Sequence, residues 1–254
     1  MQLTIDGLNL HYERQGSGKP VLILHGWGAS IAAMRPVMNC MLRLGREAVA
    51  LDFPGFGESA EPLKAWGVED FAAITRKFIA EQGIYGCDCI AHSHGGRVAI
   101  YLASEEKSLF HKLVLVDAAG VKPKRSLKYY LKVWSYKLGV RLAKISLLDR
   151  AFHISERQKN AGSEDYRNTS GTMRQTFVRL VNTDLTDRLP MVENETLLVW
   201  GENDADTPLY MAELMQKRMK SAGLAVLKGA GHFSYADDYP RFCAMMDVLF
   251  KERT

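Results

Sequence analysis

The stretch CIAHSHGGRV, residues 89–98, brings a nucleophile together with two candidate bases. Ser93 stands between His92 and His94, directly after an apolar run and ahead of two glycines. A serine hydroxyl is a weak nucleophile unless it is exposed, oriented and paired with a base. The grouping therefore predicts that Ser93 attacks an electrophilic carbon while another side chain takes its proton.

The residues on either side of Ser93 predict a sharp turn. Residues 87–91 form a mostly apolar run typical of a buried strand, and residues 95–104 have the spacing of a helix. Ala91 and Gly95 are small enough to leave room for a tight connection between the two. The first N–H groups of such a helix have no partner within it, so they would face the negative charge that develops during attack.

Short apolar runs alternate with longer segments of helical spacing along most of the chain. We expect strands over residues 3–5, 10–14, 20–26, 47–53, 87–92, 112–119, 196–201 and 225–231. We expect helices over residues 31–44, 69–82, 95–104, 209–221 and 238–251. The alternation predicts an α/β protein with a mostly parallel, eight-stranded sheet, helices on both faces, and an antiparallel hairpin of the first two strands at one edge. Ligands bind such sheets beyond the carboxyl ends of the strands, which is where Ser93 falls.

One interval departs from this alternation. Residues 121–190 contain no strand pattern, and apolar residues at three- and four-residue steps predict an amphipathic helix: Leu127, Leu131, Trp134, Leu138, Leu142 and Ile145. The eight charged residues between 121 and 148 are all basic, and we favour a solvated outer face for them over a role in attracting anionic substrates or a membrane surface. We expect a core of residues 1–120 and 191–254, with residues 121–190 as a helical cap inserted after the sixth strand.

Composition and charge exclude several classes of protein. The 254 residues are 47% hydrophobic and 24% charged, which is typical of a globular domain. The net charge is +4, and the part of the chain outside the basic cap segment carries about −4, which argues against a general nucleic-acid binder. No apolar run has the length of a membrane span, and the first residues have no signal-peptide pattern. We therefore expect a cytoplasmic protein with no nucleic-acid partner and no stable membrane insertion.

The cysteines predict no disulfide framework. The chain has four, at positions 40, 87, 89 and 243, which is too few and too scattered for such a framework. Cys87 and Cys89 are two residues apart in a predicted strand and therefore share one face of it. We interpret them as small buried side chains rather than as a redox pair.

Five segments carry a resemblance to a known family. AHSHGG resembles the G-x-S-x-G motif of the α/β-hydrolase superfamily, with Ala91 where glycine is commoner. LILHGWG resembles the family's H-G-x-G loop after the third strand, and this implies an oxyanion hole formed by the backbone N–H groups of Trp27 and His94. LDFPGFGES resembles the segment after the fourth strand, and we assign its Asp52 no chemistry.

The resemblance also supplies the partners of Ser93. LLVWGENDADTP resembles the acid loop after the family's seventh strand and matches Asp204, with Asp206 as the alternative acid. GAGHFSYADDYPRF resembles the catalytic-histidine loop and matches His232. The order Ser93, Asp204, His232 is the order expected for this superfamily. The resemblance thus implies an α/β-hydrolase fold with a Ser–His–Asp triad and no cofactor.

The remaining histidines have weaker functional signals. His25, His92 and His94 are expected to support or line the oxyanion region, because a zinc site needs three or four converging ligands and no such spacing accompanies them. Three further histidines are interpreted as structural: His11, His111 and His153.

The expected function is hydrolysis of small-molecule carboxylic esters through an acyl-enzyme, with no metal and no cofactor. Related capped hydrolases cleave carbon–carbon bonds in ring-fission products, which is the first alternative. A ligand sensor that keeps the hydrolase fold is the second. Thioester and amide hydrolysis stay open, and the sequence indicates neither the natural substrate nor the oligomeric state.

Overall fold

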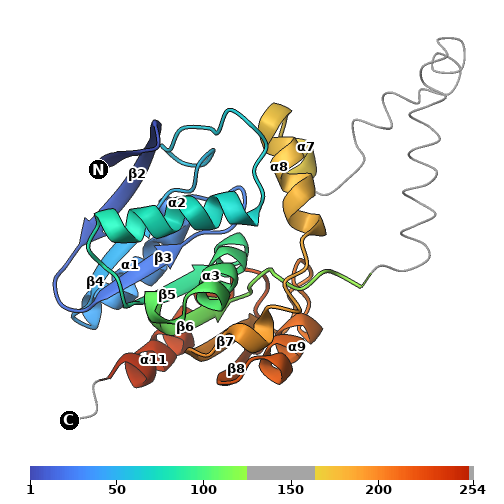
Figure 1. The fold of residues 1–254 in the computed structure, drawn as a ribbon. Coiled ribbons are helices and arrows are strands. Elements are labelled where there is room, and N and C mark those ends of the chain that lie inside the picture. The colour runs from blue at the N-terminus through green and yellow to red at the C-terminus, as the bar shows by residue number, and fades with distance from the viewer. Residues whose placement is uncertain (125–163, 252–254) are drawn as a thin grey trace, which may run out of the picture.

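The computed structural model describes residues 1–124 and 164–251 (Figure 1). Within these residues eight strands form one sheet in the order β1-β2-β4-β3-β5-β6-β7-β8. Their bounds are β1 Gln2–Ile5, β2 Leu8–Gln15, β3 Pro20–Leu24, β4 Glu47–Leu51, β5 Cys87–His92, β6 Phe110–Val116, β7 Glu195–Gly201 and β8 Ala222–Leu227. β1 and β2 pair as an antiparallel hairpin at one edge, and every pairing from β4 to β8 is parallel. The predicted sheet is confirmed.

The helices cover both faces of the sheet, as predicted. Their bounds are α1 Arg35–Arg43, α2 Val68–Glu81, α3 His94–Glu105, α7 Glu164–Asn168, α8 Gly171–Asn182, α9 Tyr210–Arg218, α10 Ser234–Asp237 and α11 Tyr239–Phe250, with short 3₁₀ turns η1 Ile31–Met34, η2 Lys107–Leu109 and η3 Leu189–Met191. One hydrophobic cluster joins the sheet to α2, α3 and α9. A second joins its other face to α1 and α11.

Alternation along β3 explains how one strand contributes to both clusters. Leu22 and Leu24 pack toward α2 and α3, whereas Val21 and Ile23 pack toward α1. Successive side chains of a strand point to opposite faces, so a run that is apolar throughout must be covered on both sides. Each such side chain contributes about 1.5–3 kcal/mol when fully buried.

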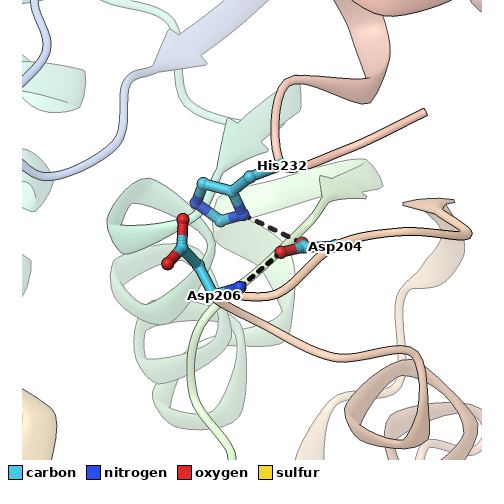
Figure 2. A group of neighbouring side chains, drawn as sticks. All are labelled: Asp204, Asp206 and His232. Atoms are coloured by element: carbon cyan, nitrogen blue, oxygen red, sulfur yellow. Dashed lines mark hydrogen bonds and ion pairs between the residues drawn. The ribbon is translucent and has the colours of Figure 1, made fainter.

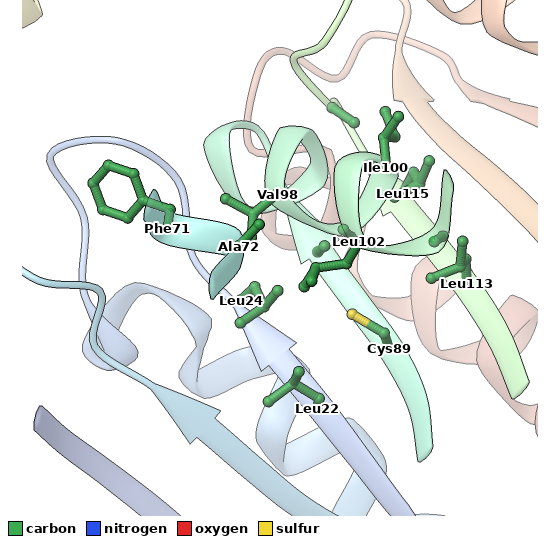
Figure 3. Packing of buried hydrophobic residues seen from close by; sticks show 14 of the residues in the cluster. Leu22, Leu24, Phe71, Ala72, Cys89, Val98, Ile100, Leu102, Leu113 and Leu115 are labelled. Atoms are coloured by element: carbon green, nitrogen blue, oxygen red, sulfur yellow. The ribbon is translucent and has the colours of Figure 1, made fainter. Parts of the chain in front are cut away.

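Packing around α3 fixes the position of the residues that precede it. Figure 3 shows Leu102 of this helix beside Cys89 of β5, and Val98 beside Ala72 of α2. Cys87 and Cys89 are free thiols buried in the core, as expected for small buried side chains. Because the interior is close-packed, α3 has little freedom to shift relative to β5.

Several predicted boundaries differ from the structure, and two of the differences have a local cause. The helix expected over residues 31–44 divides into η1 and α1, because Pro36 lies in the first turn of α1 and has no N–H to continue the preceding turn. The last strand begins at Ala222 and ends at Leu227, three residues earlier at its start than expected. The following Gly229 has a φ of 77°, which ends the extended conformation.

The segment between β6 and β7 supplies two described helices that are not part of the sheet layers. Figure 1 shows α7 and α8 beyond one end of α2, away from the strands. α8 is tied to the loop before α2, since Thr176 Oγ1 accepts from Trp66 N–H at 2.9 Å and Arg179 Nη1 donates to Ala65 O at 2.6 Å. The predicted amphipathic helix between Leu127 and Ile145 lies outside the described residues, and the cap boundaries stay a prediction.

No helix in the described ranges has both the length and the apolar character that crossing a bilayer requires.

Candidate active site

Ser93 lies in the turn between β5 and α3 with a strained backbone. Its φ is 48° and its ψ is −111°, a conformation that non-glycine residues rarely adopt. A Cβ on Gly95 would lie 2.6 Å from Leu24 O, and one on Gly96 would lie 2.4 Å from Ala118 Cβ. The two glycines therefore let the start of α3 approach β3 and the end of β6.

Backbone hydrogen bonds hold this strained turn. Ser93 N–H donates to Val116 O at 3.1 Å, and Ser93 O accepts from Ala119 N–H at 2.9 Å. Gly95 N–H donates to His25 O at 3.1 Å. Strain of this kind persists only where the surrounding structure enforces it, and it is concentrated at functional sites.

The three residues predicted as a triad lie in contact. His232 Nε2 is 3.0 Å from Ser93 Oγ, and His232 Nδ1 is 2.9 Å from Asp204 Oδ2. Both distances are normal for hydrogen bonds. Ser93 comes from the turn after β5, Asp204 from the loop after β7 and His232 from the loop after β8. Three carboxyl ends of parallel strands thus bring together residues that are up to 139 positions apart.

Asp204, rather than Asp206, is bonded to His232 (Figure 2). Asp204 Oδ1 also accepts from the N–H groups of Asp206 at 2.8 Å and Thr207 at 3.0 Å, and Oδ2 accepts from Thr207 Oγ1 at 2.6 Å. Burial favours the neutral carboxyl, but the bonds from His232 and Thr207 outweigh it and hold the pKa of Asp204 below its ordinary value. Asp206 is exposed, and its N–H helps to orient the carboxylate of Asp204.

The environment of His232 suits a general base. Burial lowers the pKa of a histidine, but the hydrogen bond and negative charge of Asp204 outweigh burial and raise the pKa of His232 above its ordinary value. A base whose pKa lies close to the working pH both accepts and returns a proton efficiently. Asp204 also fixes the tautomer, because Nδ1 must carry its proton to donate to the carboxylate, which leaves Nε2 as the acceptor facing Ser93.

Asp117 is a site residue that sequence reasoning missed. It follows β6 with a φ of 45°, is fully buried, and accepts from Gly201 N–H at 2.8 Å and from Ser234 N–H at 3.0 Å. These bonds tie the end of β6 to the end of β7 and to the loop that carries His232. Burial raises the pKa of Asp117 to about 7, against the lowering effect of its bonds to Ser234 and Gly201.

The sequence contains a signal for Asp117, but the strand expected over residues 112–119 includes this residue, so it was not considered as a residue at the end of a strand. An acidic residue directly after a buried parallel strand stands at the edge of the sheet where ligands bind.

Two of the three expected supporting histidines have defined bonds. His25 Nδ1–H donates to Gly26 O at 2.7 Å and its Nε2 accepts from Phe53 N–H at 2.9 Å. His92 Nε2–H donates to the backbone oxygen of His232 at 2.7 Å. Burial lowers the pKa of His25 to about 4 and that of His92 to about 3, so both are neutral at pH 7. His92 therefore connects the strand before the nucleophile to the loop of the base.

The residues predicted to form an oxyanion hole flank the nucleophile. His94 is the first residue of α3, where a backbone N–H has no partner within the helix. Trp27 lies in the loop after β3, and none of the described backbone groups accepts from its N–H. Both residues line the same cavity as Ser93. Their role in binding an oxyanion stays a prediction.

A cavity of about 850 Å³ opens at Ser93 and His232. Its apolar walls include Trp27, Phe56, Met173, Phe177, Val181 and Met211. Phe177 and Val181 of α8 both line this cavity, whereas Leu180 of the same helix is buried in the core. Phe177 also packs against Trp27 with ring centroids 5.2 Å apart. The polar lining includes His94, Arg97, Glu61 and Asp206.

Asp204, Asp206 and His232 also form a group whose candidate metal-ligand atoms lie within 4.8 Å of one another. The oxygens of Asp204 already accept from two backbone N–H groups, the Thr207 hydroxyl and His232. A carboxylate offers about four acceptor positions, so these bonds occupy those of Asp204. The group fits the acid and base of a triad better than it fits a metal centre.

Two of the histidines interpreted as structural bond to buried aspartates. His11 Nδ1 is 2.8 Å from Asp52 Oδ2, and His111 Nδ1 is 2.9 Å from Asp88 Oδ1. Asp52 also accepts from Ile31 N–H at 2.7 Å, so it anchors loops. His153 lies outside the described residues.

Comparison with known proteins gives a consistent result. A family model described as alpha/beta hydrolase fold matches residues 19–239. The uncharacterized hydrolase YugF of Bacillus subtilis (strain 168) is 25% identical, over 91% of this chain and 90% of its own. The pimeloyl-[acyl-carrier protein] methyl ester esterase of Vibrio vulnificus (strain CMCP6) is 24% identical, over 92% of this chain and 95% of its own. The solved structure of an esterase (EaEST) from Exiguobacterium antarcticum superposes with a TM-score of 0.76 at 23% identity, covering 98% of this chain and 97% of that chain.

Proposed function

This chain belongs to the alpha/beta hydrolase family, and we propose that it is a serine hydrolase that cleaves small-molecule carboxylic esters. The observation that carries the proposal is the continuous path of hydrogen bonds from Ser93 Oγ through His232 to Asp204. An ester is favoured because the Vibrio vulnificus relative, which matches along nearly its whole length, is named as an ester hydrolase.

In the proposed mechanism Ser93 Oγ bonds to the ester carbonyl carbon while His232 Nε2 takes the hydroxyl proton. The carbonyl oxygen becomes negative and is held by the N–H groups of Trp27 and His94. Collapse of this intermediate breaks the bond to the alcohol, which leaves with the proton from His232 and gives an acyl-serine. Preorganised donors of this kind typically supply about 3–4 kcal/mol each of transition-state stabilisation.

Water completes the proposed cycle. His232 Nε2 takes a proton from water, whose oxygen bonds to the acyl carbon. The bond to Ser93 Oγ then breaks, the acid leaves, and Ser93 regains the proton from His232. Asp204 stays ionised throughout and stabilises the imidazolium that forms twice in each cycle.

The test is steady-state hydrolysis of p-nitrophenyl esters from acetate to decanoate. Ser93→Ala and His232→Ala should each lower turnover on the order of 10⁴- to 10⁶-fold, because the triad acts as a unit. The matched control is Ser17→Ala, an exposed serine that should leave turnover unchanged. The chain-length profile of the wild type would measure the depth of the cavity.

Other results would redirect the proposal. A Ser93→Ala variant that keeps a tenth of the wild-type rate would exclude Ser93 as the nucleophile. Turnover of a vinylogous diketone together with poor turnover of every ester would move the reaction to carbon–carbon bond hydrolysis. Slow turnover with tight retention of a ligand would favour a sensor.

A further inference from the structure

Arg97 is a buried cation that faces the cavity without an anionic partner. Its side chain lines the same cavity as Ser93, and the residue is 9% exposed. Within the described part of the chain its guanidinium makes no hydrogen bond or ion pair, and its Nε is buried without an acceptor. Burial lowers the pKa of Arg97 to about 10, so the group stays charged at neutral pH. An unpaired buried charge is costly, so a bound anion would stabilise this side chain.

Two other arginines of this protein have the anionic partner that Arg97 lacks. Arg46 pairs with Asp88, and Arg76 has its Nε 3.4 Å from Glu106 Oε2. Glu61 and Asp206 are the carboxylates that line the same cavity as Arg97, and both are exposed. Neither is bonded to Arg97, so the residues that face the cavity leave its charge unmatched.

Two more buried donors without acceptors belong to residues of this cavity. Trp27 Nε1 is buried and unpaired, and so are both ring nitrogens of His94. Burial holds the pKa of His94 well below its ordinary value, so its ring is neutral and carries one N–H. An indole and a guanidinium can only donate, and a carboxylate can only accept. The unpaired guanidinium of Arg97 therefore matches a carboxylate in kind.

The position of Arg97 on α3 connects this site to the reaction. Arg97 follows Ser93 by one helical turn, and its N–H donates to Ser93 O at 3.2 Å. Residues four positions apart lie on the same face of a helix, and long side chains lean toward the helix start. The charge of Arg97 also contributes to the low pKa of His94, as expected for neighbouring groups. An anion held by Arg97 would thus lie beside the nucleophile.

We propose that Arg97 binds a carboxylate of the substrate, so that the preferred substrates are half-esters of short dicarboxylic acids. The proposal rests on the proposed ester hydrolysis for the reaction, but the anion site itself does not. The planar guanidinium fork suits the two oxygens of a carboxylate.

The first test compares monoethyl esters of succinate, glutarate and adipate with ethyl esters of the uncharged acids of the same length. The wild type should prefer the half-ester. In Arg97→Met the ratio of the two kcat/KM values should fall about 10- to 100-fold, as expected for loss of charge-assisted hydrogen bonds, and Arg97→Lys should keep part of the preference. Arg76→Met is the matched control, because its arginine pairs with Glu106 away from the cavity, and it should keep the wild-type ratio. An equal ratio in wild type and Arg97→Met would overturn the proposal.

The second test separates this inference from the proposed reaction. Glutarate is titrated calorimetrically into Ser93→Ala and into the double variant with Arg97→Met. Binding to the first that weakens at least tenfold in the second supports the carboxylate site, even if no ester is ever hydrolysed. Ester turnover by the wild type without any glutarate binding to Ser93→Ala would leave the hydrolase standing and remove the carboxylate site. Binding of inorganic phosphate in preference to glutarate would also overturn it.

Discussion

The two ends of the parallel strands treat buried charge in opposite ways. At the amino ends Asp88 and Arg46 form a buried pair, and Asp88 Oδ1 also accepts from Lys112 N–H at 3.1 Å and lies 2.9 Å from His111 Nδ1. At the carboxyl ends Arg97 is unpaired and Ser93 is strained. The same sheet thus has one edge where a buried arginine is paired with a carboxylate and one where a buried arginine has no anionic partner.

The largest expected effect is a loss of turnover at the reactive edge, by which we mean the carboxyl ends of the strands, where Ser93, Asp204 and His232 lie. Asp204→Asn should lower kcat on the order of 10⁴-fold, because an amide can offer its N–H to His232 and favour the wrong tautomer. Asp206→Asn is the control, since its carboxylate acts on His232 by charge alone and its N–H bond to Asp204 survives. A larger loss in Asp206→Asn than in Asp204→Asn would reverse the assignment of the acid.

The same pair of variants has a pH signature. His232 must be neutral to act as a base, so kcat/KM rises with pH as His232 loses its proton. The hydrogen bond and charge of Asp204 raise the pKa of His232 against the lowering effect of burial. In Asp204→Asn the effect of burial remains, so the acid limb of the profile should move to lower pH, whereas Asp206→Asn should move it less.

A smaller free-energy change is expected at the amino-end edge of the sheet, where Asp88 pairs with Arg46. There a substitution should lower stability and leave catalysis nearly unchanged. Asp88→Asn leaves Arg46 without its carboxylate and should lower the free energy of unfolding by about 3–5 kcal/mol. Urea unfolding measures this loss, and the folded variant should hydrolyse esters at close to the wild-type rate. Asp6→Asn, which breaks the exposed pair with Lys77, should cost at most about 1 kcal/mol. Loss of catalysis in folded Asp88→Asn would break the contrast between the edges.

Asp117 lies on the reactive edge but should behave in part like Asp88. In Asp117→Asn an amide N–H would face the N–H of Gly201 or Ser234, leaving a buried donor unpaired at a cost of about 1–3 kcal/mol. The loop of His232 would lose an anchor, so turnover should also fall, but less than in Asp204→Asn.

The raised pKa of Asp117 also makes the free energy of unfolding depend on pH, which gives a second test of this residue. The native carboxyl has a pKa of about 7 against an ordinary value of 3.8, so the native state keeps a proton that the unfolded chain releases. Its contribution to stability is complete below about pH 4 and is lost as pH rises through about 7. Unfolding measured between pH 4 and 8 should show this decline in the wild type, and the decline should be shallower in Asp117→Asn.

What the sequence predicts depends on whether a residue acts locally. Ser93 was predicted from the turn and its small neighbours. Asp204 and His232 were predicted from short stretches that resemble the family's acid and histidine loops. Asp117 and Arg97 were not, because an aspartate after a strand is common in turns and an arginine on a helix is usually exposed. Their burial follows from packing between distant segments. The early start of β8 was missed because Gly223 disfavours a strand, and pairing with β7 overrides that preference.

Different elements of the fold supply the triad and the apolar wall of the cavity. The residues of the proposed triad lie in the turn and loops that follow β5, β7 and β8, whereas Met173, Phe177 and Val181 all come from α8, which is not part of the sheet layers. A change on α8 can reshape the space offered to a substrate without disturbing the turn that carries Ser93. Such a division lets a lineage explore new substrates while its chemistry is conserved, and it makes α8 a practical segment for randomisation when a changed specificity is wanted.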